Sequence, residues 1–149
     1  MNLPRSEFHI LLIEDSQPDA KIIERALREG GVFHRLTVIP DGKHALDYLY
    51  RLRDESPSAD REPDLILLDL NLPGMDGCQV LTRIKSDPVL RMIPVVILTT
   101  SAAEEDVLRS YDLHANCYVT KPVDLEKFIV VVQSIDRFRL TIATLPSPR

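Results

Sequence analysis

The sequence has only two cysteines, no cluster of lysine and arginine, and no apolar run long enough to cross a membrane. The cysteines, Cys78 and Cys117, lack the short spacing of a metal-binding pair, so we expect reduced thiols that act as packing residues. Residues 1–8 contain one arginine and no apolar stretch of signal-peptide length. These absences predict a cytoplasmic protein that does not contact a membrane.

The charge balance is acidic. There are 18 lysine and arginine residues against 23 aspartate and glutamate residues, which gives a formal net charge of -5. Nucleic-acid-binding proteins concentrate basic residues on one surface, so we expect no nucleic-acid partner. The 149 residues contain no repeat, low-complexity segment or internal linker, which predicts one globular domain. The histidines show no metal-ligand spacing, and we expect them at the surface or half-buried, at positions 9, 34, 44 and 114.

Four short apolar runs each end at polar residues. The runs cover residues 10–13, 65–68, 95–98 and 118–120, and they lead into Glu14-Asp15, Asp69, Thr99 and Lys121-Pro122. Each run is too short for a helix and is typical of a buried strand in a parallel sheet. Ligands bind at the carboxyl edge of such sheets, so the pattern gathers three acids, a hydroxyl and a lysine at one edge.

Helical patterns alternate with these strands and with one further strand at residues 36–39. We predict helices at residues 18–28, 42–52, 78–84 and 101–111, and a last long helix that Asp124 caps. Residues 54–63 are polar and contain two prolines, so we expect a loop there. This alternation predicts an α/β fold with five parallel strands and right-handed crossovers.

Asp69 is the candidate nucleophile, because a carboxylate can attack phosphorus and carry an aspartyl phosphate. Two anions must then meet, and a Mg²⁺ ion that binds oxygens of both lowers their repulsion. Asp15 and Asp69 are the candidate direct ligands. Glu14 is expected to hold a metal-bound water, and the backbone carbonyl of Asn71 is a further candidate ligand.

Two more residues at this edge suit a phosphoryl group. Lys121 supplies a positive charge to the phosphoryl oxygens, and the Thr99 hydroxyl can donate a hydrogen bond to the same group. The neighbouring Thr100 is a rival for that hydroxyl role. Each residue alone has an ordinary explanation, such as a helix cap at Asp15 or a solvated charge at Lys121, and the full set is what indicates phosphoryl chemistry.

The set resembles the receiver domain of bacterial response regulators. The matching positions are Glu14-Asp15, Asp69 followed by Pro73, Gly77, Thr99 and Lys121-Pro122. The intervals also match: 54 residues from Asp15 to Asp69, 30 to Thr99 and 22 to Lys121. The resemblance covers residues 9–138, with 139–149 as a C-terminal extension of a single receiver domain spanning 1–149.

The resemblance implies a flavodoxin-like (βα)5 three-layer sandwich with a five-stranded parallel sheet. It also implies transfer of a phosphoryl group from a sensor histidine kinase to Asp69 with Mg²⁺, and an aromatic switch at Tyr118 that follows Thr99. Residues 93–101, 113–118 and 144–146 are similar to single-domain regulators that serve cyanobacterial phytochromes, which implies a phytochrome kinase as partner. We therefore expect a phosphoacceptor that assists its own phosphorylation and dephosphorylation, and not an enzyme acting on other molecules.

Two other functions remain open from the residues alone. The first is a Mg²⁺-dependent phosphatase with an aspartyl nucleophile. Such enzymes typically place a second acid two residues after the nucleophile, where this chain has Asn71, which cannot transfer a proton as a carboxyl group can. The second is an interaction module of receiver shape that is never phosphorylated, although such modules tend to lose the acids that are present here.

The last helix carries more apolar residues than one core-facing side requires. Leu125, Phe128, Ile129, Val132 and Ile135 share one face, whereas Val130 points almost the opposite way and Val131 lies on the flank. Beyond the helix we predict a tail without helical spacing, containing Phe138, Leu140, Ile142 and Leu145. We expect a homodimer through the last helix and tail, with a tail folded back over its own domain as the alternative.

Overall fold

The computed structural model describes residues 7–32, 34–55, 62–99, 117–120 and 125–144. Its sheet contains β1 (Phe8–Ile13), β2 (His34–Ile39), β3 (Leu65–Asp69), β4 (Val95–Thr99) and β5 (Cys117–Thr120). The strand order is β2-β1-β3-β4-β5, and all neighbours are parallel. This sheet agrees with the five parallel strands that the alternating pattern predicts.

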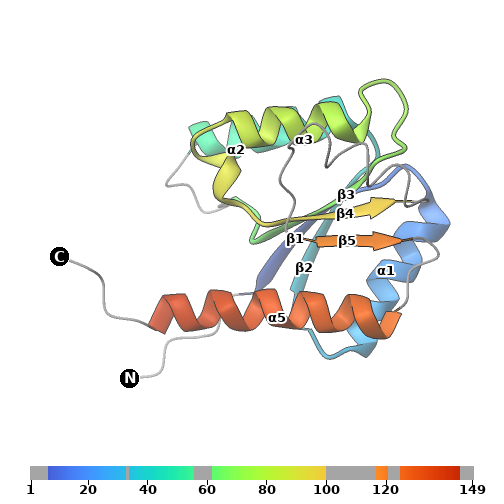
Figure 1. Ribbon diagram of the computed structural model, residues 1–149, viewed down its shortest axis with the longest axis vertical. Helices are drawn as coiled ribbons and strands as arrows, with labels where there is room; N and C mark the ends of the chain where they lie inside the picture. Colours follow the sequence, from blue (N-terminus) through green and yellow to red (C-terminus); the bar gives the residue numbers. More distant parts are fainter. Residues whose placement is uncertain (1–6, 33, 56–61, 100–116, 121–124, 145–149) are drawn as a thin grey trace.

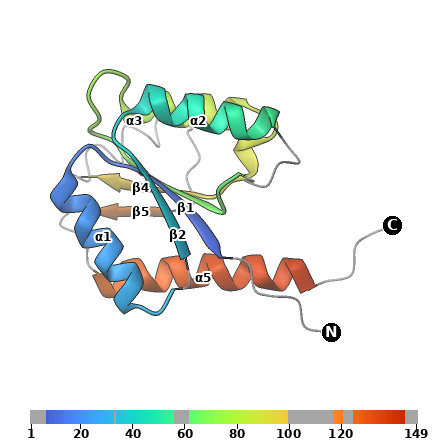
Figure 2. The same cartoon turned by 180° about the vertical axis from the view of Figure 1, so that it is seen from behind.

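Helices cover both faces of the sheet. They are α1 (Gln17–Glu29), α2 (Gly42–Asp54), α3 (Gly77–Ser86) and α5 (Leu125–Thr144), with a short 3₁₀ turn at Leu90–Met92. Figures 1 and 2 show α1 and α5 against one face and α2 and α3 against the other. The helix predicted for residues 101–111 lies outside the described residues.

Side-chain caps explain where three of the helices begin. The side chains of Ser16, Asp41 and Asp76 accept hydrogen bonds from backbone amides in the first turns of α1, α2 and α3. Asp76 and Gln79 complete a reciprocal capping box. Because each helix begins directly after a strand and its short loop, the caps also fix how the chain leaves the carboxyl edge of the sheet.

The strands divide their side chains between two cores. Phe8, Ile10 and Leu12 of β1 pack towards α1 and α5, while Leu11 and Ile13 pack towards α2 and α3. Every residue of β1, β3 and β4 is buried, as expected for parallel strands covered on both faces. From α5, the predicted core face supplies fully buried Phe128 and Val132, whereas the side chain of Val130 is 60% exposed.

The prediction of a non-helical tail after the last helix was wrong. α5 continues to Thr144, through most of the segment assigned to the extension. The physical reason is the absence of a helix breaker, since the first proline after Pro122 is Pro146 and no glycine follows Gly77. Apolar residues 131, 135, 138 and 142 then recur at intervals of four, three and four residues, which is the spacing of a helix-pairing seam.

The expectation that all four histidines lie at or near the surface was wrong for His9. Its exposed fraction is 2%, because it belongs to β1, which has a neighbouring strand on each side. The ring Nε2 lies 3.1 Å from the Thr37 hydroxyl of β2, and the backbone amide donates to Asp64 at 2.9 Å. Thr37 and Asp64 thus supply partners for the ring Nε2 and the backbone amide of this buried residue. His34 is half-buried and His44 exposed, as predicted, and His114 lies outside the described residues.

An ion pair ties α2 to the turn after α3. The Arg53 guanidinium donates to Asp87 and lies 4.9 Å from the centre of the Tyr50 ring. Asp87 also accepts hydrogen bonds from the amides of Val89 and Leu90, both at 2.9 Å. The Leu90 amide is the main cause that holds the pKa of Asp87 below its usual range; burial acts in the opposite direction, and Val89 and Arg53 add to the lowering.

The Asp87 carboxylate therefore gives a pH-dependent contribution to stability. At pH 7 we expect Asp87→Asn to lower the free energy of unfolding by about 1–3 kcal/mol, since a charged acceptor of two amides is lost. The depressed pKa means that this contribution is complete above the unfolded value of about 3.9 and is lost as the pH falls below it. Urea unfolding of both proteins at pH 7 and pH 3 measures this. An unchanged difference between the two pH values would contradict the assignment.

Candidate functional site

The strand register brings the predicted site residues to one level at the carboxyl edge. Ile13 pairs with Leu68, so Glu14 stands level with Asp69, and Asp15 follows one residue later. Asp69 pairs with Leu98 of β4, which places Thr99 one residue beyond it. The hydrogen bond from the Glu14 amide to the Ile39 carbonyl, at 3.2 Å, keeps this arrangement tied to β2.

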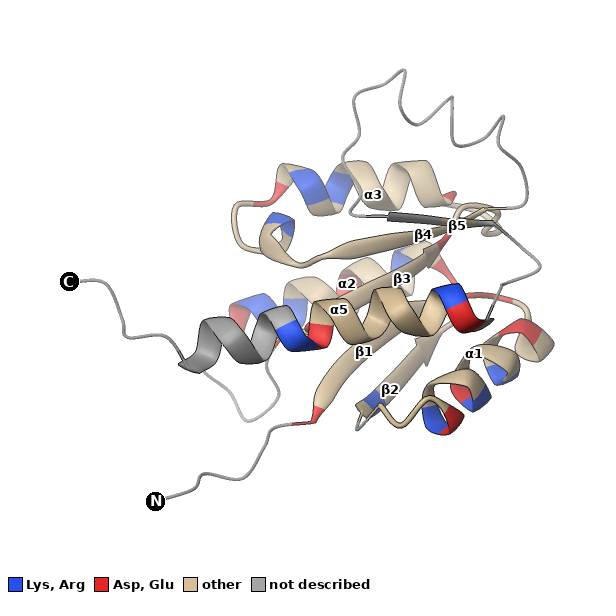
Figure 3. Ribbon diagram, turned by 60° about the horizontal axis from the view of Figure 1, so that its bottom comes forward, with Lys and Arg blue, Asp and Glu red and all other residues tan. Residues whose placement is uncertain are grey.

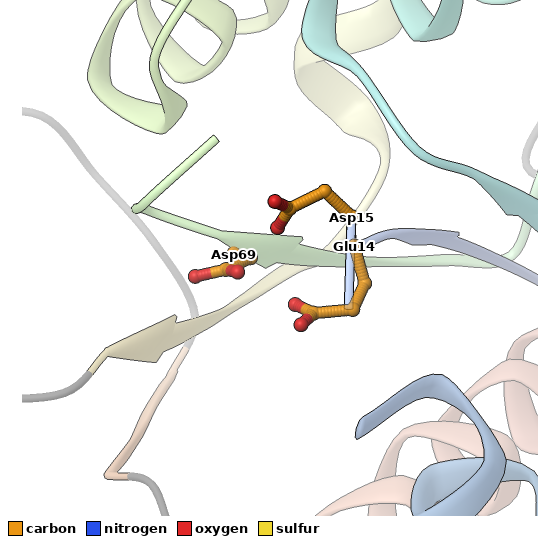
Figure 4. A group of neighbouring side chains, drawn as sticks. All are labelled: Glu14, Asp15 and Asp69. Atoms are coloured by element: carbon orange, nitrogen blue, oxygen red, sulfur yellow. The ribbon is translucent and has the colours of Figure 1, made fainter. Parts of the chain in front are cut away.

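Three carboxylates meet at this edge. One oxygen from each of Glu14, Asp15 and Asp69 lies within 4.8 Å of the other two. Glu14 and Asp69 are each only 2% exposed, whereas Asp15 is exposed. Figure 4 shows the side chains of Glu14 and Asp15 extending from the end of β1 towards the side on which Asp69 lies. The cluster is thus an acidic cup with two buried members and one that faces solvent.

The loop after β3 holds the Asp69 side chain. The Asn71 amide donates to Asp69 Oδ1 at 3.0 Å, which fixes the orientation of the carboxylate. The Leu70 amide donates to the Leu98 carbonyl at 3.1 Å, so the first loop residue is still attached to β4. Gly74 has a φ of 70°, a left-handed conformation that favours glycine, as the predicted Pro73-Gly74 turn requires.

The start of α3 closes against this loop. A Cβ atom on Gly77 would lie 2.5 Å from the Asp69 carbonyl oxygen and 2.6 Å from Leu70 Cα, distances that no real side chain adopts. The Gly77 amide also donates to the Leu70 carbonyl at 3.1 Å. The sequence pattern identified Gly77 only as a matching position, without a role; the close approach of backbone to backbone supplies its physical reason.

The remaining predicted residues fall on β4, β5 and the segment after β5. Thr99 is fully buried at the end of β4 and pairs with Thr120. Tyr118 belongs to β5, where the structure describes the backbone and not its side chain. Lys121 and Thr100 lie outside the described residues, so the positive charge and the rival hydroxyl stay predictions.

The donor set suits a hard divalent cation. Carboxylate and backbone carbonyl oxygens are the ligands that Mg²⁺ takes in proteins, usually one or two carboxylates with several waters. Figure 4 shows the Asp15 carboxylate above and the Glu14 carboxylate below the level of Asp69, and one oxygen of each lies within 4.8 Å of the other two. A cation there would also reduce the mutual repulsion of the three acids.

Comparison with known proteins assigns the chain to a family. Residues 10–133 match the profile of the response regulator receiver domain. The response regulator Rcp1 of Synechocystis sp. is 46% identical over 138 residues, covering 93% of this chain and 92% of Rcp1.

Two solved structures are also similar. The phosphorylated cyanobacterial phytochrome response regulator RcpA is 48% identical, with a TM-score of 0.71 over 95% of this chain and all of RcpA. The Mn²⁺-bound form of Rcp1 is 45% identical, with a TM-score of 0.69 over 93% of this chain and 99% of Rcp1. The chain therefore belongs to the response regulator receiver domains of two-component signalling, and its fold is the flavodoxin-like receiver fold that the sequence resemblance implied.

The repulsion within the acidic cup makes a stability prediction. In the presence of a chelator we expect Asp69→Asn to stabilise the fold by about 1 kcal/mol, because like charges roughly 4 Å apart repel by about that amount even in water. Mg²⁺ should stabilise the wild type by about 2.7 kcal/mol at 100 times its Kd, and the variant much less. Thermal unfolding with and without Mg²⁺ measures both effects. The exposed acid Asp47 of α2 gives the control Asp47→Asn, which should respond to Mg²⁺ as the wild type does.

Proposed function

We propose that this chain accepts a phosphoryl group on Asp69 from the phosphohistidine of a sensor histidine kinase. The observation that carries the proposal is the acidic cup, in which Asp69 is buried beside Glu14 and Asp15 at the carboxyl edge of a receiver-type sheet. In the transfer, a carboxylate oxygen of Asp69 attacks phosphorus as the bond from phosphorus to the imidazole nitrogen breaks. The imidazole leaves with the electron pair of that bond, and an aspartyl phosphate remains.

A Mg²⁺ ion is the proposed cofactor. Asp15 and Asp69 would bind it directly, the Asn71 carbonyl would be a further ligand, and Glu14 would hold one of its waters. The ion supplies positive charge that lets two anionic groups approach. The choice of a divalent cation is supported by the three clustered carboxylates and by the Mn²⁺-bound form of the similar protein Rcp1.

The residues around Asp69 have proposed roles after attack. Lys121 neutralises phosphoryl charge, and the buried Thr99 hydroxyl donates a hydrogen bond to the phosphoryl group. Movement of Thr99 would leave space for the Tyr118 ring to turn inward, and the resulting change of surface would be the signal. The pairing of Thr99 with Thr120 supports this route, since it places the end of β4 beside the end of β5.

The proposed kinase is a phytochrome, because the similar proteins include RcpA, a cyanobacterial phytochrome response regulator. A kinase that uses ATP places the reaction in the cytoplasm. No helix in the described part of the chain is long and apolar enough to cross a membrane.

We assign the receiver domain to residues 9–138. The predicted helix at 101–111 would bring its helices to five, and residues 139–149 form an extension into which α5 continues. Signalling would then depend on partner contacts, without nucleic acid and without turnover of another substrate.

The phosphoacceptor assignment has a direct test. Acetyl phosphate or a phosphorylated histidine kinase should label the wild type in the presence of Mg²⁺ and fail to label it with excess chelator. Asp69→Asn should lower labelling at least 100-fold, because an amide is a far weaker nucleophile than a carboxylate. Asp47→Asn, which alters an exposed acid on α2, should be labelled as the wild type is. Normal labelling of Asp69→Asn would refute the acceptor, and rapid turnover of simple phosphate esters would favour the phosphatase.

We also propose that two copies associate through α5. The helix has no charged residue between Lys127 and Asp136, and Figure 3 shows this stretch without acidic or basic colour. Val130 is 60% exposed, and Val131 and Ile135 are only partly buried. The helix projects beyond the strands in Figures 1 and 2. In the sequence, its apolar positions 131, 135, 138 and 142 keep the spacing of a helix-pairing seam. A two-fold pair of such helices would cover this apolar surface.

Sedimentation at tens of micromolar tests the dimer. We expect a dimer for the full chain, a monomer without residues 138–149, and at least a tenfold weaker dimer for Val130→Glu. Ile22→Glu is the matched control, because Ile22 is also an exposed apolar residue on a helix, at 48%, but lies on α1. A full-length monomer would refute the dimer. A truncated dimer would exclude the extension from the interface and favour the rest of α5.

A further inference from the structure

The first residue of α2 makes an unusually close contact with the loop that carries the site. A Cβ atom on Gly42 would lie 2.5 Å from Val80 Cγ2 of α3 and 2.9 Å from the Met75 carbonyl oxygen. Gly42 is buried, and its backbone is not in the left-handed region where glycine is favoured for conformation. Space is therefore the reason for a glycine here: the start of α2 lies directly against the end of the β3–α3 loop.

This contact is one of two close glycine contacts that restrain the loop. Gly77, the residue after the loop, approaches the carbonyl oxygen of Asp69 at the start of the loop, where a Cβ atom would lie 2.5 Å away. Met75 is joined to Gly77 through the single residue Asp76, whose side chain caps α3. The loop between Asp69 and Gly77 also contains Asn71, whose amide donates to Asp69 Oδ1. Because only Asp76 separates Met75 from Gly77, a displacement of Met75 would be transmitted to the backbone around Asp69.

We propose that Gly42 is a positioning residue for the Asp69 site: by allowing α2 to touch Met75, it sets the path of the loop that aims Asp69 and the Asn71 carbonyl. This inference rests on the proposed function, because it takes the cation site to be built from Asp15, Asp69 and Asn71. Gly42 does not touch the ligands, and it acts through Met75 and the loop. A methyl group at position 42 would push the Met75 carbonyl, shift the loop and separate Asp69 from Asp15.

The Val80 contact allows the positioning role of Gly42 to be tested separately from its role in core packing. Gly42→Ala creates two clashes, one with a Val80 methyl group and one with the Met75 carbonyl. Val80 is fully buried and β-branched, so it cannot move aside easily, and its clash mainly lowers the stability of the fold. Val80→Ala removes that methyl group and leaves the Met75 clash intact. Stability and cation affinity should therefore respond differently in the double variant.

The experiment measures Mn²⁺ affinity from the EPR signal of the free ion, with Mg²⁺ competition, alongside thermal unfolding. Gly42→Ala should raise the Kd for Mn²⁺ at least threefold, and Val80→Ala alone should leave it within twofold of the wild type. The double variant Gly42→Ala/Val80→Ala should keep the threefold rise in the Kd for Mn²⁺. Its loss of stability should be smaller than the sum of the losses in the two single variants. If the double variant binds Mn²⁺ like Val80→Ala, Gly42 is a packing residue and the proposal is overturned. The double variant also keeps the test available if Gly42→Ala alone fails to fold.

Two controls complete the design. Gly31 follows the end of α1 and has a φ of 74° with nothing within 4 Å of an added Cβ, so Gly31→Ala strains the backbone without a clash. It should lower stability and leave the Kd for Mn²⁺ unchanged; a raised Kd would show that general destabilisation explains the effect and would overturn the proposal. Asp69→Asn must weaken Mn²⁺ binding. If it does not, the proposed cation site fails; if it does and Gly42→Ala binds normally, only the positioning role fails.

Discussion

The parallel pairing of β1 with β3 and of β3 with β4 is the constraint on which the site depends. Each pair is held by backbone hydrogen bonds between fully buried apolar strands, so neither strand can slide without exposing core residues. That register places Glu14 level with Asp69 and Thr99 one residue beyond. The acids repel one another, and the burial of the strands beneath them opposes that repulsion. The fold thus uses hydrophobic energy to hold a charge arrangement that isolated side chains would avoid.

The position of the Asp69 side chain is set by backbone contacts beyond the strands. Two helix starts, at Gly42 and Gly77, approach the β3–α3 loop more closely than any side chain would permit. Asp69 also accepts the Asn71 amide, so part of its orientation is decided by the loop and not by the strand. Gly74 gives the loop its left-handed turn, whereas Gly42 and Gly77 are explained by close contacts with the loop. Precise placement of a reactive carboxylate therefore depends on the glycines that lack a Cβ atom as much as on the side chains that are present.

Much of this arrangement could be predicted from the sequence, because the strands are short apolar runs that end at polar residues. The runs at 10–13, 65–68 and 95–98 indicated both the sheet and its functional edge. The end of α5 could not be found in the same way, since a family resemblance suggested a boundary near residue 138 where the chain has no helix breaker. The role of Gly42 left no signal, because a glycine after Asp41 is also typical of an ordinary helix start.

Burial of His9 was missed for a related reason. Periodicity identifies apolar strand residues, and a histidine at the first positions of a strand is indistinguishable from a loop residue in sequence. In the structure it belongs to β1, an inner strand, and its partners come from segments distant in the chain: Thr37 of β2 and Asp64 before β3. Contacts of this kind depend on the strand order β2-β1-β3, which places both neighbours beside β1 only after the chain has crossed over twice.

Two elements lead from the acidic cup towards α5. One is α1, which begins directly after Asp15 and ends at Gly30, where the Gly30 carbonyl accepts a hydrogen bond from Gln133 at 3.1 Å and a Cβ atom would lie 2.9 Å from Ile129. The other is β4, the strand that pairs with β5 and ends at Thr99. The Gly30 contact is a tight fit, so it anchors the middle of α5 to the end of α1 that lies away from the cup. In the proposed signalling route from Asp69 through β4 and β5, this anchor would hold the middle of α5, so a movement of the helix would be largest at its projecting end.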